Sequence, residues 1–380
     1  MVAVMALLLA QTAVARDAIQ PHLTLDAEGT AYVVFIRNGN IELSTSSDQG
    51  KTFSTPVTAI DAKGKARGGM QRGPRVAVDG RKTVYVSAPL TFDESEFQKR
   101  YPTQDLYLAV STDGGKSFSK PVMVNDQPKK APESLHWLAA SPAEGAFVAW
   151  LDIRAREKGQ DLFLAKITEQ GKKISRNAPL ATALCECCAP GLAVDAKGNP
   201  IVAFREGGGK TNRPIGILLS KNGGSSFGPP VRLNTEDSKV DSCPMDAPAV
   251  AVGPDGKTLA AAWMDMRAGN NNRDVQWTIG TAAGRFPPET AVNDDRTGVQ
   301  GHPSLAVAED GTVWCAWEDG RSGPNSQRVY ATDSKSKKNV PVSDEKEGKA
   351  AYPSLAARGG FVGAAYETPA GIVFRVVAGR

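Results

Sequence analysis

The sequence is poor in the features that mark membrane, nucleic-acid-binding and helical proteins. No apolar stretch reaches the roughly 18 residues that a membrane-spanning helix needs. Lys and Arg number 45 against 41 Asp and Glu, and the net charge of +4 is spread over 380 residues without a basic run. We therefore expect neither a membrane span nor a nucleic-acid partner. No segment of helical periodicity is longer than Glu94 to Lys99, so strand-period repeats must carry the fold.

The N-terminal residues allow two interpretations. Val2 to Leu9 is apolar, and Ala13-Val14-Ala15 has the small-x-small form of a signal-peptidase site, although a positively charged start is missing. We expect residues 1–15 to be a signal peptide, which would make the remaining chain, 16–380, secreted or periplasmic. The alternative is that Thr12 to Val14 forms a strand of the mature protein.

An eight-residue turn motif occurs three times. It reads S-S-D-Q-G-K-T-F at 46–53, S-T-D-G-G-K-S-F at 111–118 and S-K-N-G-G-S-S-F at 220–227. Each copy lies between an alternating apolar run and a short second one, which is typical of a β-hairpin. Asp48, Asp113 and Asn222 can accept hydrogen bonds from turn amides, and Gly115 can adopt a positive φ. We predict that these residues are structural.

A second repeat interlocks with the first and predicts the architecture. It reads P-x-[LV]-x-[VL], then a turn, then a strand that ends in an aromatic residue. Copies begin at Pro21, Pro74, Pro190, Pro248, Pro303 and Pro353, and a degenerate copy runs from Leu135 to Trp150. A spacing of about 50 to 60 residues fits four short strands per unit. The sequence therefore predicts one all-β propeller of seven four-stranded blades, with six as the alternative, in which Thr12 to Val14 could complete the last blade.

The repeat also predicts which loops share a face. If the strands of a blade are called A to D from the axis outward, the D-to-A and B-to-C connections lie at one end of the ring and the C-to-D turns at the other. The first face surrounds the channel mouth, the usual place for a site. Its D-to-A connections carry Arg72, His136, Cys187, Cys188, residues 243–246, His302 and Tyr352, and its B-to-C connections carry Asp93, Asp152, Arg154, Arg205, Glu206, Asp265, Arg267, Asp319, Arg321 and Glu367.

The turn motif resembles the Asp-box (BNR repeat) of sialidases and related β-propellers, and that resemblance implies candidate catalytic residues. Gln71-Arg72-Gly73-Pro74 resembles the sialidase Phe-Arg-Ile-Pro segment, whose arginine begins a triad that binds the substrate carboxylate. Tyr352-Pro353-Ser354-Leu355 and Tyr366-Glu367 resemble the segments around the sialidase nucleophile. The resemblance implies Tyr352 as nucleophile, Asp93 as general acid with Glu94 and Glu96 as rivals, and Glu206 as the group that activates the tyrosine.

The remaining triad arginines would come from Arg205, Arg267 or Arg321. Two of these arginines belong to W-x-D-x-R segments, which begin at Trp150, Trp263 and Trp317. A structural interpretation is open for this motif: the Trp packs between blades, and the Asp and Arg pair with each other. Arginines left unpaired would bind a carboxylate bidentately.

The cysteines depart most from a sialidase. Cys185, Cys187, Cys188 and Cys243 fall in neighbouring D-to-A connections, whereas Cys315 lies inside the strand predicted at 313–317 and should be an inert core thiol. One interpretation is that disulfides pin adjacent loops, as suits an exported protein. Another is a thiolate site for Zn or Cu(I), to which His302, His136 and Met245 could add ligands. Reduced, unliganded thiols are the third. No other cofactor is expected.

Two functions remain open from the sequence. One is an exported sialidase-like glycoside hydrolase that acts on an acidic or decorated glycan. The other is a non-catalytic propeller whose mouth binds a glycan, a protein or a metal. Either function predicts a carbohydrate or small-molecule ligand at the mouth, and we expect a monomer. A complete arginine triad would favour the enzyme, and Asp–Arg pairs closed on one another would favour the binding protein.

Overall fold

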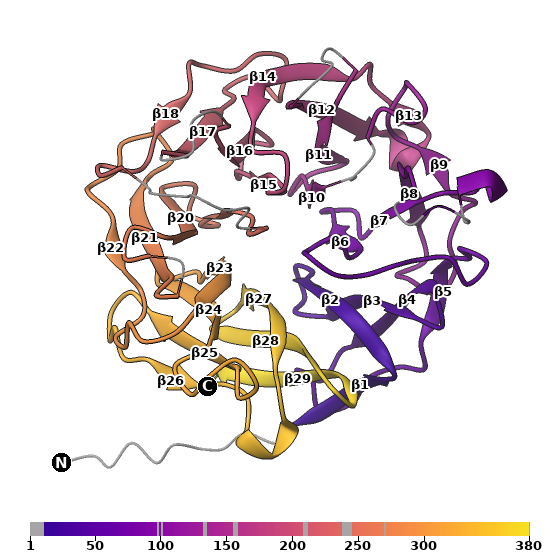
Figure 1. Cartoon of the computed structure of the whole chain (residues 1–380). Coiled ribbons are helices and arrows are strands. Elements are labelled where there is room, and N and C mark those ends of the chain that lie inside the picture. Colours follow the sequence, from indigo (N-terminus) through magenta and orange to yellow (C-terminus); the bar gives the residue numbers. More distant parts are fainter. Residues whose placement is uncertain are drawn as a thin grey trace.

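The computed structural model describes residues 11–96, 99, 102–131, 135–154, 159–207, 212–237, 245–269 and 271–379. Its strands form seven antiparallel sheets arranged as blades around one axis, which confirms the predicted seven-bladed propeller (Figure 1). The first blade contains β2 (Ala18–Leu25), β3 (Ala31–Arg37), β4 (Asn40–Ser46) and β5 (Val57–Ile60), and the second contains β6 (Arg75–Val78), β7 (Val84–Leu90), β8 (Asp105–Ser111) and β9 (Val122–Met123). The third blade contains β10 (His136–Ala140), β11 (Ala146–Asp152), β12 (Gln160–Thr168) and β13 (Lys173–Ile174). The fourth contains β15 (Gly191–Val194), β16 (Pro200–Arg205), β17 (Ile215–Leu219) and β18 (Val231–Arg232).

The other three blades complete the ring. The fifth blade contains β19 (Ala249–Val252), β20 (Thr258–Asp265), β21 (Asp274–Thr281) and β22 (Thr290–Ala291). The sixth contains β23 (Gln300–Val307), β24 (Val313–Asp319), β25 (Arg328–Asp333) and β26 (Val340–Pro341). The seventh contains β27 (Ala351–Arg358), β28 (Phe361–Thr368), β29 (Gly371–Ala378) and the N-terminal β1 (Thr12–Arg16). An extra strand, β14 (Ala178–Leu184), pairs with β12 in the third blade.

The last blade closes the ring with the N-terminal strand. β1 pairs antiparallel with β29, so segments from the two ends of the described chain lie side by side (Figure 1). Val14 and Ala15 are buried in the core shared with the first blade. The strand alternative for Thr12 to Val14 is therefore what the structure contains. Residues 1–10 lie outside the described part of the chain, and cleavage after Ala15 stays a prediction.

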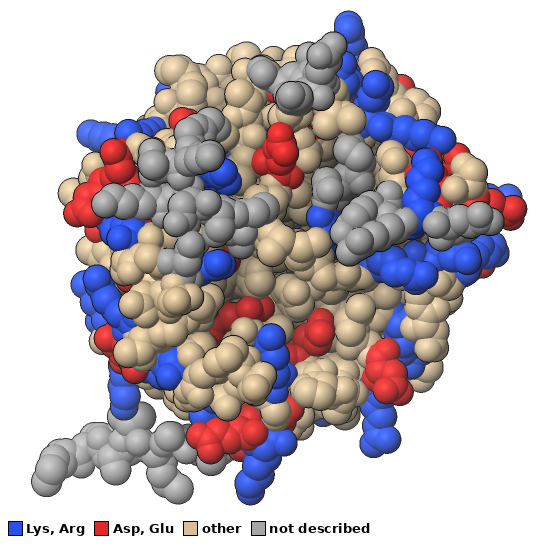
Figure 2. Space-filling model, in the orientation of Figure 1, with Lys and Arg blue, Asp and Glu red and all other residues tan. Residues whose placement is uncertain are grey.

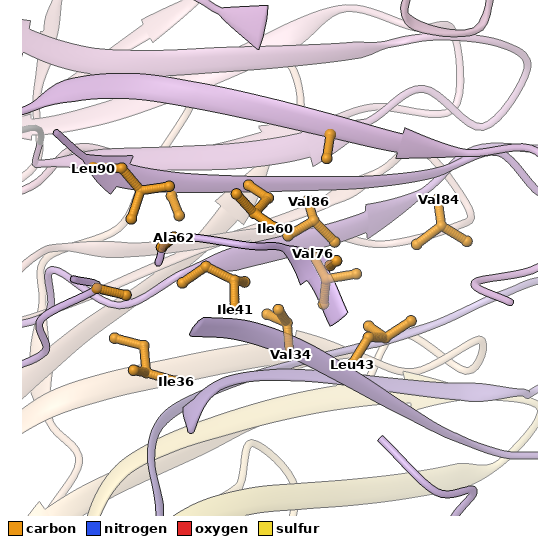
Figure 3. Packing of buried hydrophobic residues seen from close by; sticks show 14 of the residues in the cluster. Val34, Ile36, Ile41, Leu43, Ile60, Ala62, Val76, Val84, Val86 and Leu90 are labelled. Atoms are coloured by element: carbon orange, nitrogen blue, oxygen red, sulfur yellow. The ribbon is translucent and has the colours of Figure 1, made fainter. Parts of the chain in front are cut away.

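The blades are held together by apolar faces that pack against one another around the ring. Between the first two blades, Val34 and Ile41 meet Val76 and Val86 (Figure 3). Each of these side chains is at most 1% exposed, and burial at roughly 25 cal/mol per Å² makes such contacts the main stabilising term. Because every sheet is covered on both faces, central strands such as β7 read as near-continuous buried runs.

The three predicted C-to-D turns have the local hydrogen bonds that their sequence suggests. The Asp48 carboxylate accepts from the backbone N–H of Thr52 at 3.0 Å, and Asp113 accepts from that of Ser117 at 3.0 Å. Asn222 accepts from Ser226 N–H at 2.9 Å. Gly115 has φ of 88°, and a Cβ there would lie 2.7 Å from Leu43 Cδ2, so the predicted positive φ is confirmed. These bonds are local, so the turns are structural.

Helix is scarce in the described residues. Three short 3-10 turns occur, and one of them, Glu94–Glu96, falls in the segment where the sequence has helical periodicity. Over the described ranges no helix has both the length and the apolar character needed to cross a membrane. On the face shown in Figure 2, most Lys and Arg side chains lie toward the rim, and several acidic side chains lie closer to the axis.

Candidate functional site

Three innermost strands begin with the same backbone irregularity. The residue before the strand proline has a left-handed conformation, with φ of 58° at Gln20, 48° at His302 and 51° at Tyr352. The pairing register of β2, β23 and β27 shifts at these points. A bulge of this kind re-aims a side chain, and strained non-glycine backbone is found where surrounding contacts hold it in place. Gln20 and Tyr352 consequently line the pocket at the ring's centre.

A carboxylate from the preceding blade supports each of these residues. In every case it accepts a hydrogen bond from the backbone N–H of the left-handed residue. The donor–acceptor pairs are Gln20 with Glu367 at 2.8 Å, His302 with Asp246 at 2.6 Å and Tyr352 with Glu318 at 2.7 Å. A charge-assisted bond to a backbone N–H is strong enough to offset part of the cost of the positive φ.

His302 lies between two of these acids and is held as a cation. Its Nδ1 is 2.8 Å from Glu318 Oε1. Burial alone would lower the pKa of His302, but the charges of Glu318 and Asp246 outweigh burial and raise that pKa to about 9. Burial raises the pKa of the Asp246 carboxyl, and His302 and Arg205 oppose that rise. Glu318 also accepts a hydrogen bond from Gln327 Nε2 at 2.9 Å, so both of its oxygens are engaged.

Tyr352 is the member of this network that lines the pocket together with Gln20, and Glu367 supports Gln20 through a backbone hydrogen bond. Tyr352 stacks on His302 with ring centroids 5.2 Å apart, and its phenolic oxygen accepts from Met70 N–H at 3.3 Å. Burial raises the pKa of Tyr352, and the charges of Glu318 and Glu367 add to the rise. Burial likewise raises the pKa of Glu367. Gln20 lies next to both groups, since its N–H donates to Glu367 and it lines the same pocket as Tyr352.

The pocket itself is small and has a cationic and aromatic wall. It encloses about 390 Å³ of empty space, counting its open mouth. Arg75 packs its guanidinium 4.4 Å from the ring centre of Trp137, and burial lowers the pKa of Arg75 to about 9. The guanidinium donates to the carbonyl oxygens of Gln71, Gly73 and Pro74. Across the mouth, Gln71 Oε1 accepts from Ala247 N–H at 2.7 Å.

Of the predicted catalytic residues, the structure brings only Tyr352 to this pocket. Arg72 directly follows the lining residue Gln71, and its N–H donates to Gly69 O at 3.0 Å. Asp93 lies away from the lining and pairs with Lys129 at 2.7 Å. Hydrogen bonds from Lys129 and Ser95 hold the pKa of Asp93 well below its usual range, which is the opposite of what a general acid needs. Glu206 bridges to Leu184 through its backbone and is also outside the lining.

The W-x-D-x-R segments are closed on themselves. Arg154, Arg267 and Arg321 each donate through Nε and Nη2 to the aspartate two residues earlier. A further acid from a neighbouring connection completes each fork; these partners are Asp126, Glu289 and Asp294. This arrangement favours the structural interpretation of the motif. The predicted roles of Arg267 and Arg321 in substrate binding stay predictions.

Arg205, the remaining triad candidate, is almost completely buried. It is 1% exposed, and its Nη2 donates to Met264 O at 2.7 Å. Its Nη1 donates to Arg213 O at 3.4 Å. The positive charge of Arg205 lowers the pKa of Cys185, of Cys188 and of Asp246. This cation is therefore close to both the thiol group and the Asp246 carboxyl.

Three cysteines of the connection between the third and fourth blades converge. The Sγ atoms of Cys185, Cys187 and Cys188 lie within 4.8 Å of one another. A hydrogen bond from Cys188, aided by Arg205 and Arg213 against the effect of burial, lowers the pKa of Cys185 to about 6, whereas burial raises that of Cys188 well above its usual value. Cys185 and Cys188 are free thiols.

Other cysteine and histidine predictions have separate outcomes. Cys243 lies outside the described residues, so its predicted pairing stays a prediction. Cys315 is fully buried in β24, as expected for a core thiol. His136 and His302 are not part of the thiol group: His136 Nε2 is 2.9 Å from the Ser87 hydroxyl, and His302 pairs with Glu318.

Sequence reasoning missed Gln20 and Glu318, noted Asp246 and Glu367 at the mouth without a role, and considered His302 only as a possible metal ligand. A usable signal was present: a polar or aromatic residue stands directly before the strand proline in Gln20-Pro21, His302-Pro303 and Tyr352-Pro353. The supporting acids lie in other blades, so no local pattern connects them to their partners.

Comparison with known proteins supports the fold. No protein-family model and no curated protein matches the sequence. The α-L-arabinanase of Penicillium chrysogenum, solved with arabinobiose, is 16% identical, covers 86% of this chain and 98% of its own, and gives a TM-score of 0.57. A protein of unknown function from Dyadobacter fermentans is 13% identical over 96% and 97% of the two chains, with a TM-score of 0.54. The leech intramolecular trans-sialidase is 13% identical over 94% and 68%, with a TM-score of 0.53. At this identity the likeness establishes the shared propeller fold alone.

Proposed function

We propose that this protein is a glycoside hydrolase whose reacting groups lie at the channel mouth. The observation that carries the proposal is Tyr352, a partly exposed phenol in the pocket wall, held in left-handed backbone beside two carboxylates. Arabinan- and sialic-acid-processing enzymes among the similar structures make a glycan the natural class of ligand.

Tyr352 is proposed as the nucleophile and Glu367 as the group that takes its proton. Within the described part of the chain, one oxygen of Glu367 accepts a hydrogen bond, whereas both oxygens of Glu318 are engaged. A carboxylate with a raised pKa is a stronger base, and its pKa lies closer to neutral pH. Glu318 would act as a positioning residue that fixes the backbone of Tyr352. In this role Glu367 replaces Glu206, the residue implied by resemblance.

The proposed substrate is a neutral or only weakly acidic sugar rather than a sialoside. A sialidase would need several arginines directed at the substrate carboxylate. In the described structure, Arg267 and Arg321 spend their donors on their own aspartates, and Arg205 is sealed against backbone oxygens. Because Arg267 and Arg321 are paired with their own aspartates and Arg205 is buried, bidentate recognition of a substrate carboxylate by these three residues would lose its main source of affinity.

Hydrolysis of a panel of fluorogenic glycosides, including an α-L-arabinofuranoside and a sialoside, tests the proposal. Tyr352→Phe should lower kcat by at least about 100-fold, because the phenolic oxygen acts in the transition state, while KM changes little. Glu367→Gln should lower kcat and shift the acidic limb of the pH profile. Tyr107→Phe removes a phenol on an outer strand and should leave both constants unchanged. An unaltered kcat in Tyr352→Phe would refute the mechanism.

A non-catalytic glycan-binding propeller is the second candidate. The closed Asp–Arg pairs favour it, since they neutralise charges at the mouth that a sialidase-like enzyme would use for its substrate. This candidate predicts no turnover of any glycoside, together with saturable binding in calorimetry that Tyr352→Ala weakens. Turnover by the wild-type protein decides against it.

We also propose that the protein is exported and that Cys187 pairs with Cys243. The apolar Val2 to Leu9 segment and the use of four cysteines near the mouth support export. Mass spectrometry of the oxidised, digested protein tests the pairing, and sequencing of the mature N-terminus tests cleavage after Ala15.

A further inference from the structure

The thiol group between the third and fourth blades is arranged as a ligand set. Cys185 Sγ lies 3.6 Å from both Cys187 Sγ and Cys188 Sγ. Among the described residues, this is the group of three ligating side chains whose donor atoms all converge. Cys185 and Cys188 are 3% exposed, so two of the sulfurs are shielded from water and the third, Cys187, gives access from the mouth.

The backbone around the thiols is fixed by contacts to both flanking blades. Cys185 N–H donates to Arg205 O at 3.1 Å, and Leu184 bridges to Glu206, which ties the segment to the fourth blade. Gln160 Nε2 donates to Glu186 O at 2.9 Å, which ties it to the third. The sulfurs are therefore held together by the fold, and binding a metal would require little reordering.

We propose that, once the disulfide proposed for Cys187 is reduced, Cys185, Cys187 and Cys188 form a trigonal thiolate site for Cu(I). Three sulfurs with no oxygen or imidazole among them select a soft cation. Zn(II) in proteins prefers four tetrahedral ligands, so a three-sulfur set suits Cu(I) better.

The charges around the cluster fit such a complex. Cu(I) with three thiolates carries two net negative charges, and a buried charge is costly unless it is paired. Arg213 Nη1 donates to Cys185 Sγ at 3.5 Å. The positive charge of Arg205 acts on both Cys185 and Cys188. Two guanidinium groups thus offset the two negative charges.

The site is opened by a balanced chemical step. A phosphine reductant and one water molecule convert the Cys187 disulfide into two thiols, with the phosphine becoming its oxide. Cu(I) then binds the three sulfurs and displaces three protons. In the oxidised protein the Cys187 sulfur is engaged in that disulfide, which leaves two thiols and a weaker site.

Competition with a chromogenic Cu(I) chelator under anaerobic conditions tests the proposal on the full chain. The phosphine-reduced wild type should bind one Cu(I) per chain, with an ultraviolet thiolate-to-copper charge-transfer band. Cys188→Ser and Cys187→Ser should each weaken binding by at least tenfold, and Arg213→Gln by about tenfold, as for groups that surround metal ligands. Cys315→Ala removes a thiol remote from the cluster and should change nothing. Circular dichroism checks that each variant is folded.

Several outcomes would overturn the proposal. Copper binding that survives both Cys187→Ser and Cys188→Ser would assign the metal to another place. Equal affinity in oxidised and reduced protein would remove the dependence on reduction, and Zn(II) binding tighter than Cu(I) would make the site a zinc site. If Cys188→Ser fails to fold, the half-buried Cys187→Ser carries the test. None of these readouts depends on glycoside hydrolysis, so the two proposals fail independently.

Discussion

Two repeated features of the channel mouth both depend on a carboxylate that accepts hydrogen bonds, but the carboxylate binds a different kind of donor in each. In the W-x-D-x-R loops, the carboxylate binds the side chain of a neighbouring arginine, and both charges are consumed inside the loop. At the starts of β2, β23 and β27, the carboxylate binds a backbone N–H instead, and two of the supported residues, Gln20 and Tyr352, line the pocket. The first feature closes a loop, and the second presents a residue.

The difference shows why repetition alone does not identify a site. The Asp–Arg loops repeat almost identically in three of the seven blades, where the paired charges fix the loop after the second strand. The presented residues differ in type, being Gln20, His302 and Tyr352, although their backbone geometry is the same. A backbone support that repeats within the chain while the supported side chains differ is the arrangement expected of a ligand-facing surface on a rigid scaffold.

The largest effect is expected from opening a closed loop. Asp319→Ala would leave the cation of Arg321 and the buried N–H of Trp317 without their shared partner, after bonds of 2.8 and 2.9 Å are lost. The free energy of unfolding should fall by about 3–5 kcal/mol, as when one member of a buried ion pair is removed. Urea denaturation measures the change.

The exposed pair of Asp310 and Lys335 provides the control for that experiment. Both side chains are more than half exposed, so Asp310→Ala should leave the urea midpoint nearly unchanged. A loss of stability in Asp319→Ala no larger than in Asp310→Ala would show that the closed loops contribute nothing special.

The presented residues should make stability depend on pH. The pKa of His302 is raised from 6.5 to about 9, so folding favours its protonated form. The resulting stabilisation, roughly 3 kcal/mol at most, is fully present below pH 6.5 and is lost as the pH rises through about 9. Glu318→Gln should therefore destabilise the protein strongly below pH 6.5 and much less above pH 9.

Denaturation of wild type and Glu318→Gln across this pH range provides the measurement. Glu345→Gln, in which the lost carboxylate is on a surface pair with Arg328, is the matched control and should show no such pH dependence. A constant stability difference between wild type and Glu318→Gln at all pH values would mean that His302 is not charged in the folded protein.

The architecture could be predicted from sequence because its signals are local and repeated. Each blade begins with a similar apolar strand, so seven copies reinforce one another, and three blades add the turn motif that contains residues such as Asp113 and Gly115. The closing role of Thr12 to Val14 was visible for the same reason: the last unit had room for three strands, and one strand was left over at the start of the chain.

The site could be predicted only in part because its bonds cross between blades. Tyr352 could be identified from its position before a strand proline. Its support by Glu318, 34 residues earlier, and the approach of Glu367 through Gln20, 347 residues away, depend on how the ring closes. The loop of Asp93 was predicted at the mouth from topology; in the structure its carboxylate pairs with Lys129 and is not part of the pocket lining, and its catalytic role stays a prediction.

The smallest effect is expected from a single bond that spans the mouth. Gln71 Oε1 accepts from Ala247 N–H at 2.7 Å, which joins the connection before β6 to the one before β19. Gln71→Ala would leave that amide without its partner, and the free energy of unfolding should fall by about 1 kcal/mol. Gln127→Ala, at an exposed position, should have no effect.

Hydrogen exchange gives the sharper measurement: the Ala247 amide should exchange faster in Gln71→Ala while the amides of the β20 core keep their protection, because only the bond across the mouth is lost. Faster exchange throughout the fifth blade would instead mean that this bond holds the whole blade in the ring.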